Sequence, residues 1–203
     1  IAAAISGVRT VCASGCDFAT LTGATGVFNA INTGVVTGNV DVQVAGDLTA
    51  GEDGTSALNA LQEEPAGSGF TVRLYPTGAP RAITGAFNGA LVRLNGSSRV
   101  TIDGSVGGTG TDRSLTIQNS STTTPTVVLI GSTGTTPITG VTLKNCVVVN
   151  GANTSSAVVI SDAGTLGNAG YFSNITVQNN DVQKAFVGIF ATGGTTPQHG
   201  SDL

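Results

Sequence analysis

Charged side chains are scarce in this sequence, and the shortage argues against several classes of protein. Asp, Glu, Lys and Arg make up only 10% of the 203 residues, whereas a globular domain usually has about a quarter. The net charge is −4 and the eight basic residues are scattered, so binding to nucleic-acid phosphates is not expected. No apolar run reaches the ~18 residues of a membrane-spanning helix, so membrane insertion is not expected either.

Aromatic residues and methionine are also in short supply. There is no Trp and no Met, and there are two Tyr and seven Phe. Because proteins commonly stack aromatic rings on sugars, this scarcity argues against a strong carbohydrate site. Gly is abundant instead, with 30 residues, together with Ser, Thr, Asn and Val. These residues favour short strands joined by many turns, so we expect all-β structure.

The three cysteines form one close pair and one isolated residue. Cys12 and Cys16 enclose Ala-Ser-Gly, and we expect them to close a small disulfide loop in an oxidising compartment. Half of a metal site is the alternative, but no second pair or nearby His completes it. Cys146 lies in an apolar run, where we expect a buried residue rather than a nucleophile served by the distant His199. No metal and no cofactor are therefore expected.

Residues 1–38 differ from the rest and are expected to form an N-terminal tail and a capping helix. Asp17 is a good N-cap and Gly34 a good stop. Between them runs an apolar stripe at helical spacing, made of Phe18, Leu21, Phe28 and Ile31. Residues 39–44 then alternate apolar and polar side chains, which predicts a strand. The first residues are too few and uncharged for an intact signal peptide, so a mature secreted chain is expected.

Residues 50–69 form an acidic interruption before the repetitive part of the chain. Thr55 suits the cap of a short helix that Pro65 would end. We expect a solvated surface loop here, and a cation or partner site is the alternative. The segment holds four of the twelve acidic residues, namely Glu52, Asp53, Glu63 and Glu64.

Two strand motifs recur after residue 70, and recurrence points to a repeat architecture. The first motif reads apolar, Thr, apolar, polar, Asn or Gly, and starts at residues 100, 115, 141 and 175. The second is an apolar run, in which the steps from Val127 to Val158 to Val187 are 31 and 29 residues. Short strands at a nearly constant long period favour a solenoid of stacked coils. We expect an all-β, right-handed parallel β-helix over residues 39–203 as one continuous domain; a Greek-key sandwich is the alternative.

Stacked coils would align like side chains in columns. Strand side chains alternate, so the Thr of the first motif is expected to point outward and its neighbours inward. The expected outward column is Thr101, Thr116, Thr142 and Thr176. The closing Asn is expected to form a ladder at a turn, through Asn119, Asn145 and Asn179. A single Thr column makes an ice-binding face only a minor alternative function.

Several segments resemble proteins of known fold. They are Gly15–Leu21 with Ala30–Asn32, Val40–Val44, Asp53–Asn59 and Val100–Gly104. Together they resemble the right-handed parallel β-helix proteins of the pectate-lyase and pectin-methylesterase superfamily, in particular the large extracellular surface proteins of Bacteroidota and related bacteria. The resemblance implies a secreted or cell-surface, adhesin-like protein. It implies no activity, because proteins of one fold differ widely in function.

The residues that enzymes of these families use are not recognisable here. No strand matches the catalytic Asp segment of pectin methylesterases, and no acidic calcium cluster with a basic Arg, as in pectate lyases, is evident. We therefore assign no catalytic residue. The remaining candidates for a polar groove that binds sugar, which are equally compatible with a solvated surface, are Arg93, Arg99, Asp103, Asp112 and Arg113.

The ends of a solenoid carry unpaired strand edges, and such edges recruit other strands. The capping helix can cover one end, whereas residues 193–203 offer no evident cap. Ile1 and Ile5 form an apolar tail suited to supplying a strand to a neighbour. We therefore expect a non-enzymatic extracellular structural protein, an adhesin, sheath or filament subunit that self-associates or stacks on further domains. The alternative is a β-helix that binds or degrades polysaccharide, as a lyase, esterase or hydrolase.

Overall fold

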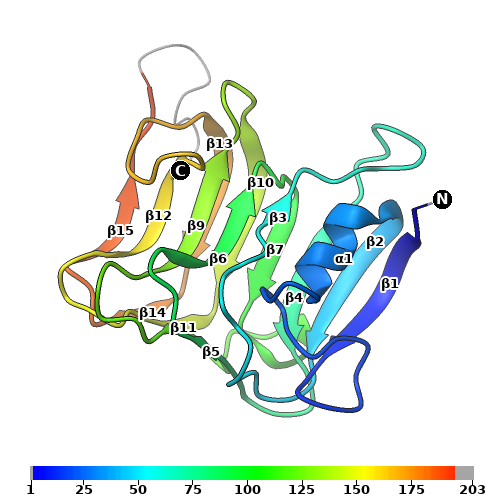
Figure 1. The fold of residues 1–203 in the computed structure, drawn as a ribbon, viewed down its shortest axis with the longest axis horizontal. Helices are drawn as coiled ribbons and strands as arrows, with labels where there is room; N and C mark the ends of the chain where they lie inside the picture. The colour runs from blue at the N-terminus through cyan, green and yellow to red at the C-terminus, as the bar shows by residue number, and fades with distance from the viewer. Residues whose placement is uncertain (1, 195–203) are drawn as a thin grey trace.

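The chain folds into a parallel β-solenoid of about six turns in a computed structural model that describes residues 2–194 (Figure 1). Successive coils add strands to three sheets, and every strand pairing between them is parallel. The expected all-β solenoid with a helix near its N-terminus is confirmed, and the sandwich alternative is wrong, because a sandwich is built from antiparallel strands.

The three sheets are named here A, B and C. Sheet A contains β1 (Ala4–Val11), β2 (Val35–Val44), β4 (Val72–Pro76), β7 (Val100–Asp103), β10 (Ile138–Lys144) and β13 (Phe172–Gln178). Sheet B contains β5 (Arg81–Gly85), β8 (Leu115–Asn119), β11 (Cys146–Val149) and β14 (Asp181–Gln183). Sheet C contains β3 (Leu58–Asn59), β6 (Ala90–Asn95), β9 (Thr126–Ser132), β12 (Ser156–Asp162) and β15 (Val187–Ala191).

Columns of apolar side chains run through the interior between the sheets. In sheet A the register stacks Val42, Leu74, Ile102 and Leu143, each at most 2% exposed. Each such side chain contributes about 1.5–3 kcal/mol before the entropy of ordering is subtracted. The second sequence motif is confirmed as one stack of neighbouring strands, because β6, β9, β12 and β15 are consecutive in sheet C.

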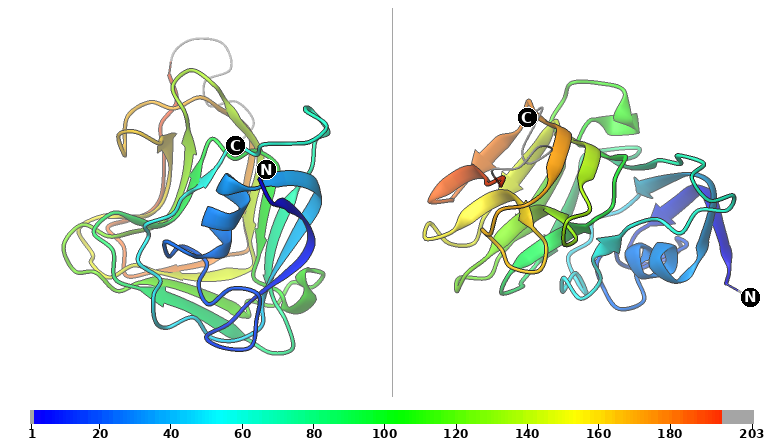
Figure 2. Two further views of the ribbon diagram at one scale, coloured as in Figure 1. Left: turned by 45° about the vertical axis from the view of Figure 1, so that its right-hand side comes forward. Right: turned by 90° about the horizontal axis from the view of Figure 1, so that it is seen from above.

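The N-terminal helix α1 (Val27–Thr33) is present but is shorter than predicted. Asp17 is not its cap; the Asp17 carboxylate accepts hydrogen bonds from the Thr10 backbone N–H at 2.8 Å and the Thr10 hydroxyl at 3.1 Å. The apolar face of α1 is buried and contacts β3, and Figure 2 shows the helix at the N-terminal end of the coils. The helix thus takes, in the first coil, the place that sheet C strands take later.

Two expectations about the early part of the chain need correction. The boundary predicted after residue 38 falls inside β2, and β1 pairs with β2, so residues 4–11 already belong to the stack. Residues 55–65 contain no helix, and β3 forms there and pairs with β6. Leu58 of β3 is fully buried, so tertiary packing decides the conformation of this segment over its local helix signals.

The outward threonines belong to two sheets rather than to one column. Thr101, Thr142 and Thr176 are aligned in sheet A as predicted. Thr116 lies apart from them, in β8 of sheet B. The first sequence motif therefore marks strands of both sheets, because a strand of either sheet alternates in the same way and then ends at a corner.

Candidate functional site

A buried carboxylate lies at the corner where sheet A leads into sheet B. Asp103 is 1% exposed, and its Oδ1 accepts hydrogen bonds from the Ser105 backbone N–H, the Ser105 hydroxyl and Asn145 Nδ2, at 2.8–3.0 Å. Lys144 Nζ lies 3.0 Å from Oδ2. Burial acts to raise the pKa of Asp103, but hydrogen bonds from Asn145 and Ser105, together with the Lys144 ammonium, outweigh it and hold the pKa below its usual value.

This corner continues as a polar ladder across neighbouring coils. Asn145 and Asn179 both have left-handed backbone conformation, with φ of 58° and 51°. Asn179 Nδ2 donates to Asn145 Oδ1 at 2.7 Å, and Arg113 Nη2 donates to Asn179 Oδ1 at 2.7 Å. The predicted Asn ladder is therefore confirmed for these two residues, and it links Asp103 at one end to Arg113 at the other.

The third predicted member of the ladder, Asn119, belongs to a different corner. It ends β8, where sheet B leads into sheet C, and it is fully buried. Its Nδ2 donates to the backbone carbonyls of Phe87, Gly89 and Thr126 at 2.8–2.9 Å. Asn119 therefore ties its own coil to the loop between β5 and β6 of the preceding coil, at a corner other than that of Asp103.

The five charged residues predicted to form a polar groove do not come together. Arg93 lies in β6 of sheet C and donates to the carbonyls of Gly54 and Thr55. Arg99 lies before β7 and forms an ion pair with Glu63 at 2.7 Å. Only Asp103, Asp112 and Arg113 share the corner between sheets A and B, and each has intramolecular partners. The arrangement braces the coils and leaves no open polar site among these five.

Asp112, exposed at this corner, also has a lowered pKa. The hydrogen bond from the Ser114 side chain is the main cause, followed by the backbone N–H of Val106. The nearby charge of Asp103 acts in the opposite direction. Asp112 therefore stays ionised and holds the loop between the two sheets.

Most of the acidic segment is exposed, as its composition predicts, but two of its carboxylates are withdrawn from solvent. Glu52 is 3% exposed and accepts hydrogen bonds from the backbone N–H groups of Leu21 and Thr22 and from the Thr22 hydroxyl. The Glu63 side chain is 8% exposed and binds Arg99. Each acid joins segments far apart in sequence, so these two carboxylates are structural rather than a cation or partner site.

The cysteines are placed as predicted. Cys12 and Cys16 form a disulfide, and Cys146 is free and fully buried. Burial, with a smaller contribution from the negative charge of Asp103, raises the pKa of the Cys146 thiol far above its usual value. A nucleophilic cysteine needs a lowered pKa, so Cys146 serves as a packing residue.

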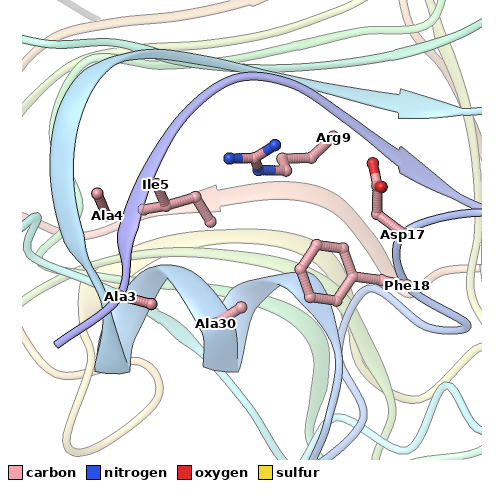
Figure 3. Close-up of a pocket in the computed structure, with 7 residues that line it drawn as sticks. All are labelled: Ala3, Ala4, Ile5, Arg9, Asp17, Phe18 and Ala30. Carbon is pink, nitrogen blue, oxygen red and sulfur yellow. The ribbon is translucent and has the colours of Figure 1, made fainter.

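A pocket of about 270 Å³ opens at the N-terminal end of the solenoid, beside β1 and α1 (Figure 3). Arg9 pairs in register with the buried Val42, so its side chain faces the interior. It lies at the N-terminal end of the column of sheet A side chains that continues through Val42. In Figure 3 the guanidinium extends toward Ile5 and away from the Asp17 carboxylate. Asp17 also lines the pocket, and the rest of the lining is apolar and consists of Ala3, Ala4, Ile5, Phe18 and Ala30.

Sequence reasoning missed Arg9 because it took the first residues as a tail. Ile5, expected in that tail, is 5% exposed in β1 and pairs with Val36, so it belongs to the core. Ile1, the other predicted tail residue, lies outside the described residues, as does His199. A strand signal was present in the alternation of Ile5, Gly7 and Val11, but the charge of Arg9 interrupts it.

The last coil exposes large apolar side chains. Phe186 is 77% exposed, Ile189 46% and Phe190 37%. Ile189 stacks on Val158 and, through it, on Val128, both of which are fully buried. A side chain of a core column is therefore partly open to solvent at this end.

No protein-family model, curated protein or solved structure matches this chain. The resemblance in the sequence is thus supported only at the level of the fold, a parallel β-solenoid. Within residues 2–194, no group of three or more His, Cys, Asp or Glu side chains is placed to hold a metal ion. Over the same residues, no helix is long and apolar enough to cross a membrane.

Proposed function

We propose that the protein is a non-enzymatic extracellular structural protein, a β-helical adhesin, sheath or filament subunit that self-associates through its last coil. The exposed Phe186 and Ile189 on that coil carry the proposal, because Ile189 continues a column that is buried everywhere else. A strand edge with apolar side chains readily accepts further strands. The buried charges of Asp103, Glu52 and Glu63 support it too, since all of them brace the coils.

The two ends of the solenoid differ, and the difference favours contact between like ends. At the N-terminal end, α1 takes the sheet C position and Arg9 puts a charge at the head of a sheet A column. If the last coil of a second copy stacked on the N-terminal end, it would bury the charge of Arg9, and its sheet C strand would face α1 instead of a strand. Two copies that join last coil to last coil would instead cover the same apolar surface on both, as in an isologous two-fold contact.

An extracellular location is part of the proposal. The Cys12–Cys16 disulfide supports it, because disulfides persist in oxidising compartments. The resemblance to extracellular β-helix surface proteins of Bacteroidota supports it as well. The large share of Gly, Thr and Asn and the small share of charged residues suit an exposed solenoid rather than an enzyme with convergent acids and bases.

Sedimentation velocity and negative-stain electron microscopy of the folded chain test the proposal. We expect concentration-dependent dimers, joined last coil to last coil, that Ile189→Lys abolishes. Val106→Lys is the matched control, because Val106 is 36% exposed and lies far along the chain, at the corner between sheets A and B. A monodisperse monomer at the highest attainable concentration, or equal assembly of both variants, would contradict the proposal.

Polysaccharide binding is a second candidate, favoured by a hollow of about 280 Å³ on sheet C. The hollow combines side-chain hydroxyls with the Phe190 ring, and its lining includes Thr124, Thr126, Ser155 and Ser156. Affinity electrophoresis in gels that contain acidic or neutral polysaccharides tests it. Retardation that Phe190→Ala removes would support this function, and unchanged mobility in every gel would exclude it.

A further inference from the structure

We propose that the pocket at the N-terminal end binds a small monocarboxylate with a short aliphatic chain, whose carboxylate is held by Arg9. The inference is independent of self-association, because it concerns the opposite end of the solenoid. It depends on three observations, which are the lack of a direct ion pair for Arg9 within residues 2–194, the largely apolar lining of the pocket, and the position of Asp17.

Arg9 has no direct ion-pair partner among residues 2–194, and its charge acts on the Asp17 carboxylate only as a minor cause of the lowered Asp17 pKa. Its guanidinium makes one hydrogen bond, to the Val8 carbonyl at 3.3 Å. The five N–H donors of arginine are therefore almost all free. Because the side chain is half-buried at the head of a core column, part of its hydration is lost. A carboxylate would restore the missing interactions through two parallel hydrogen bonds.

The surroundings of Arg9 suit an alkyl chain. Figure 3 shows Ile5 beside the guanidinium and Phe18 and Ala30 along the wall formed by the loop and α1. Small side chains create the space, since Ala3, Ala4 and Ala30 line it. Its volume of about 270 Å³ lies just below the ~300 Å³ at which ligand pockets usually begin. The occupant is therefore small.

Asp17 gives the pocket a preference for one carboxylate over two. Its pKa is lowered, mainly by the hydrogen bonds from the Thr10 backbone and hydroxyl, so Asp17 is ionised at neutral pH. Its carboxylate is already bound to Thr10, and the Arg9 guanidinium extends away from it toward Ile5. A ligand with a second carboxylate at the far end of its chain would bring that charge into the same lining, where Asp17 and the apolar residues disfavour it.

Titration of the ¹⁵N-labelled folded chain with hexanoate, followed by amide chemical shifts, tests the inference. We expect saturable shifts of Ala4, Phe18 and Ala30, and weaker binding of hexanol and of adipate. Arg9→Gln should weaken hexanoate binding roughly tenfold or more, as expected for loss of a charge-assisted pair. Arg113→Gln is the matched control, because it removes the same charge at the distant corner with Asn179.

A second variant keeps the test decisive if Arg9→Gln disturbs the first coil. Ala30→Leu retains a good helix former in α1 and fills the pocket, so it should block hexanoate while leaving circular dichroism unchanged. Absence of shifts at saturating hexanoate would overturn the inference. Equal binding of hexanol, or shifts confined to other coils, would overturn it as well.

Discussion

Lys144 and Asp103 form an ion pair across two coils in which one partner is buried and the other reaches solvent. Lys144 Nζ lies 3.0 Å from Asp103 Oδ2, and the two side chains are 32% and 2% exposed. The two residues are aligned in register, so the pair joins β7 to β10. Asp103 also receives hydrogen bonds at Oδ1 from Ser105 and Asn145, whereas Oδ2 has the Lys144 ion pair and no hydrogen bond, and these contacts together hold the corner.

Asp103→Asn should lower the free energy of unfolding at neutral pH by about 1–3 kcal/mol, the cost of a broken buried hydrogen-bond set. The folded-state pKa of Asp103 is below the ordinary aspartate value of 3.8. Its stabilisation is therefore present above that value and is lost as the pH falls through the folded pKa. Urea unfolding at neutral and acid pH should show the two proteins converging in acid, and a gap that persists there would contradict the assignment.

Two substitutions of Asn145 distinguish what its side-chain amide contributes to stability from what its left-handed backbone conformation contributes. Asn145→Gly keeps the left-handed conformation easy but removes the bonds to Asp103 and Asn179, so a loss of about 1–3 kcal/mol is expected. Asn145→Ala should lose about 1 kcal/mol more, because Ala disfavours positive φ. Asn174→Gly, at an exposed residue with φ of 52°, is the control and should change the unfolding midpoint little.

The inward assignment of the sheet B strands is tested by neighbouring residues of β8. Ile117 is fully buried between Ile83 and Val148, so Ile117→Asp should unfold the solenoid by burying an unpaired charge. Thr116→Asp places the same charge on the outer face and should change stability by about 0.5 kcal/mol or less. Circular dichroism and thermal melting distinguish the two. A native-like melt for Ile117→Asp would refute the assignment.

The disulfide should tighten the N-terminal end without being essential to the fold. Closing its short loop restricts the unfolded chain by about 2 kcal/mol on the chain-entropy model. Reduction should therefore lower the melting temperature modestly. Iodoacetamide treatment of the reduced folded protein should label Cys12 and Cys16 but spare the buried Cys146, which mass spectrometry can count. Labelling of Cys146 before unfolding would contradict its burial.

Two other carboxylates, Asp17 and Glu63, also contribute to the loss of stability in acid. Asp17 and Glu63 have lowered pKa values as well, Asp17 mainly through Thr10, and Glu63 because bonds from Gly69, Phe70 and Arg99 outweigh its burial. Both groups therefore contribute to the same loss of stability as the pH falls, which is why the comparison with Asp103→Asn is needed to isolate the corner.

The sequence alone determined the strand alternation, the solenoid and the Cys12–Cys16 disulfide, because these depend on local patterns. Alternation selects the residues that face inward, a repeat near 30 residues implies stacked coils, and a gap of three residues lets two cysteines meet. The alternation predicts that Ile102 and Leu143 face inward, and both are buried, whereas no pattern predicted the strand that contains Leu74.

Only the tertiary structure decided which sheet each strand joins and what the charged residues do. Thr116 and Asn119 share a motif with Thr142 and Asn145 but lie in another sheet, because the loops between motifs differ in length. Glu52 and Arg9 look like surface residues in sequence. Glu52 is buried because Leu21 and Thr22, a coil away, present unpaired N–H groups to it. Arg9 faces inward because β1 pairs with β2, and such pairings between distant segments leave no local trace in the chain.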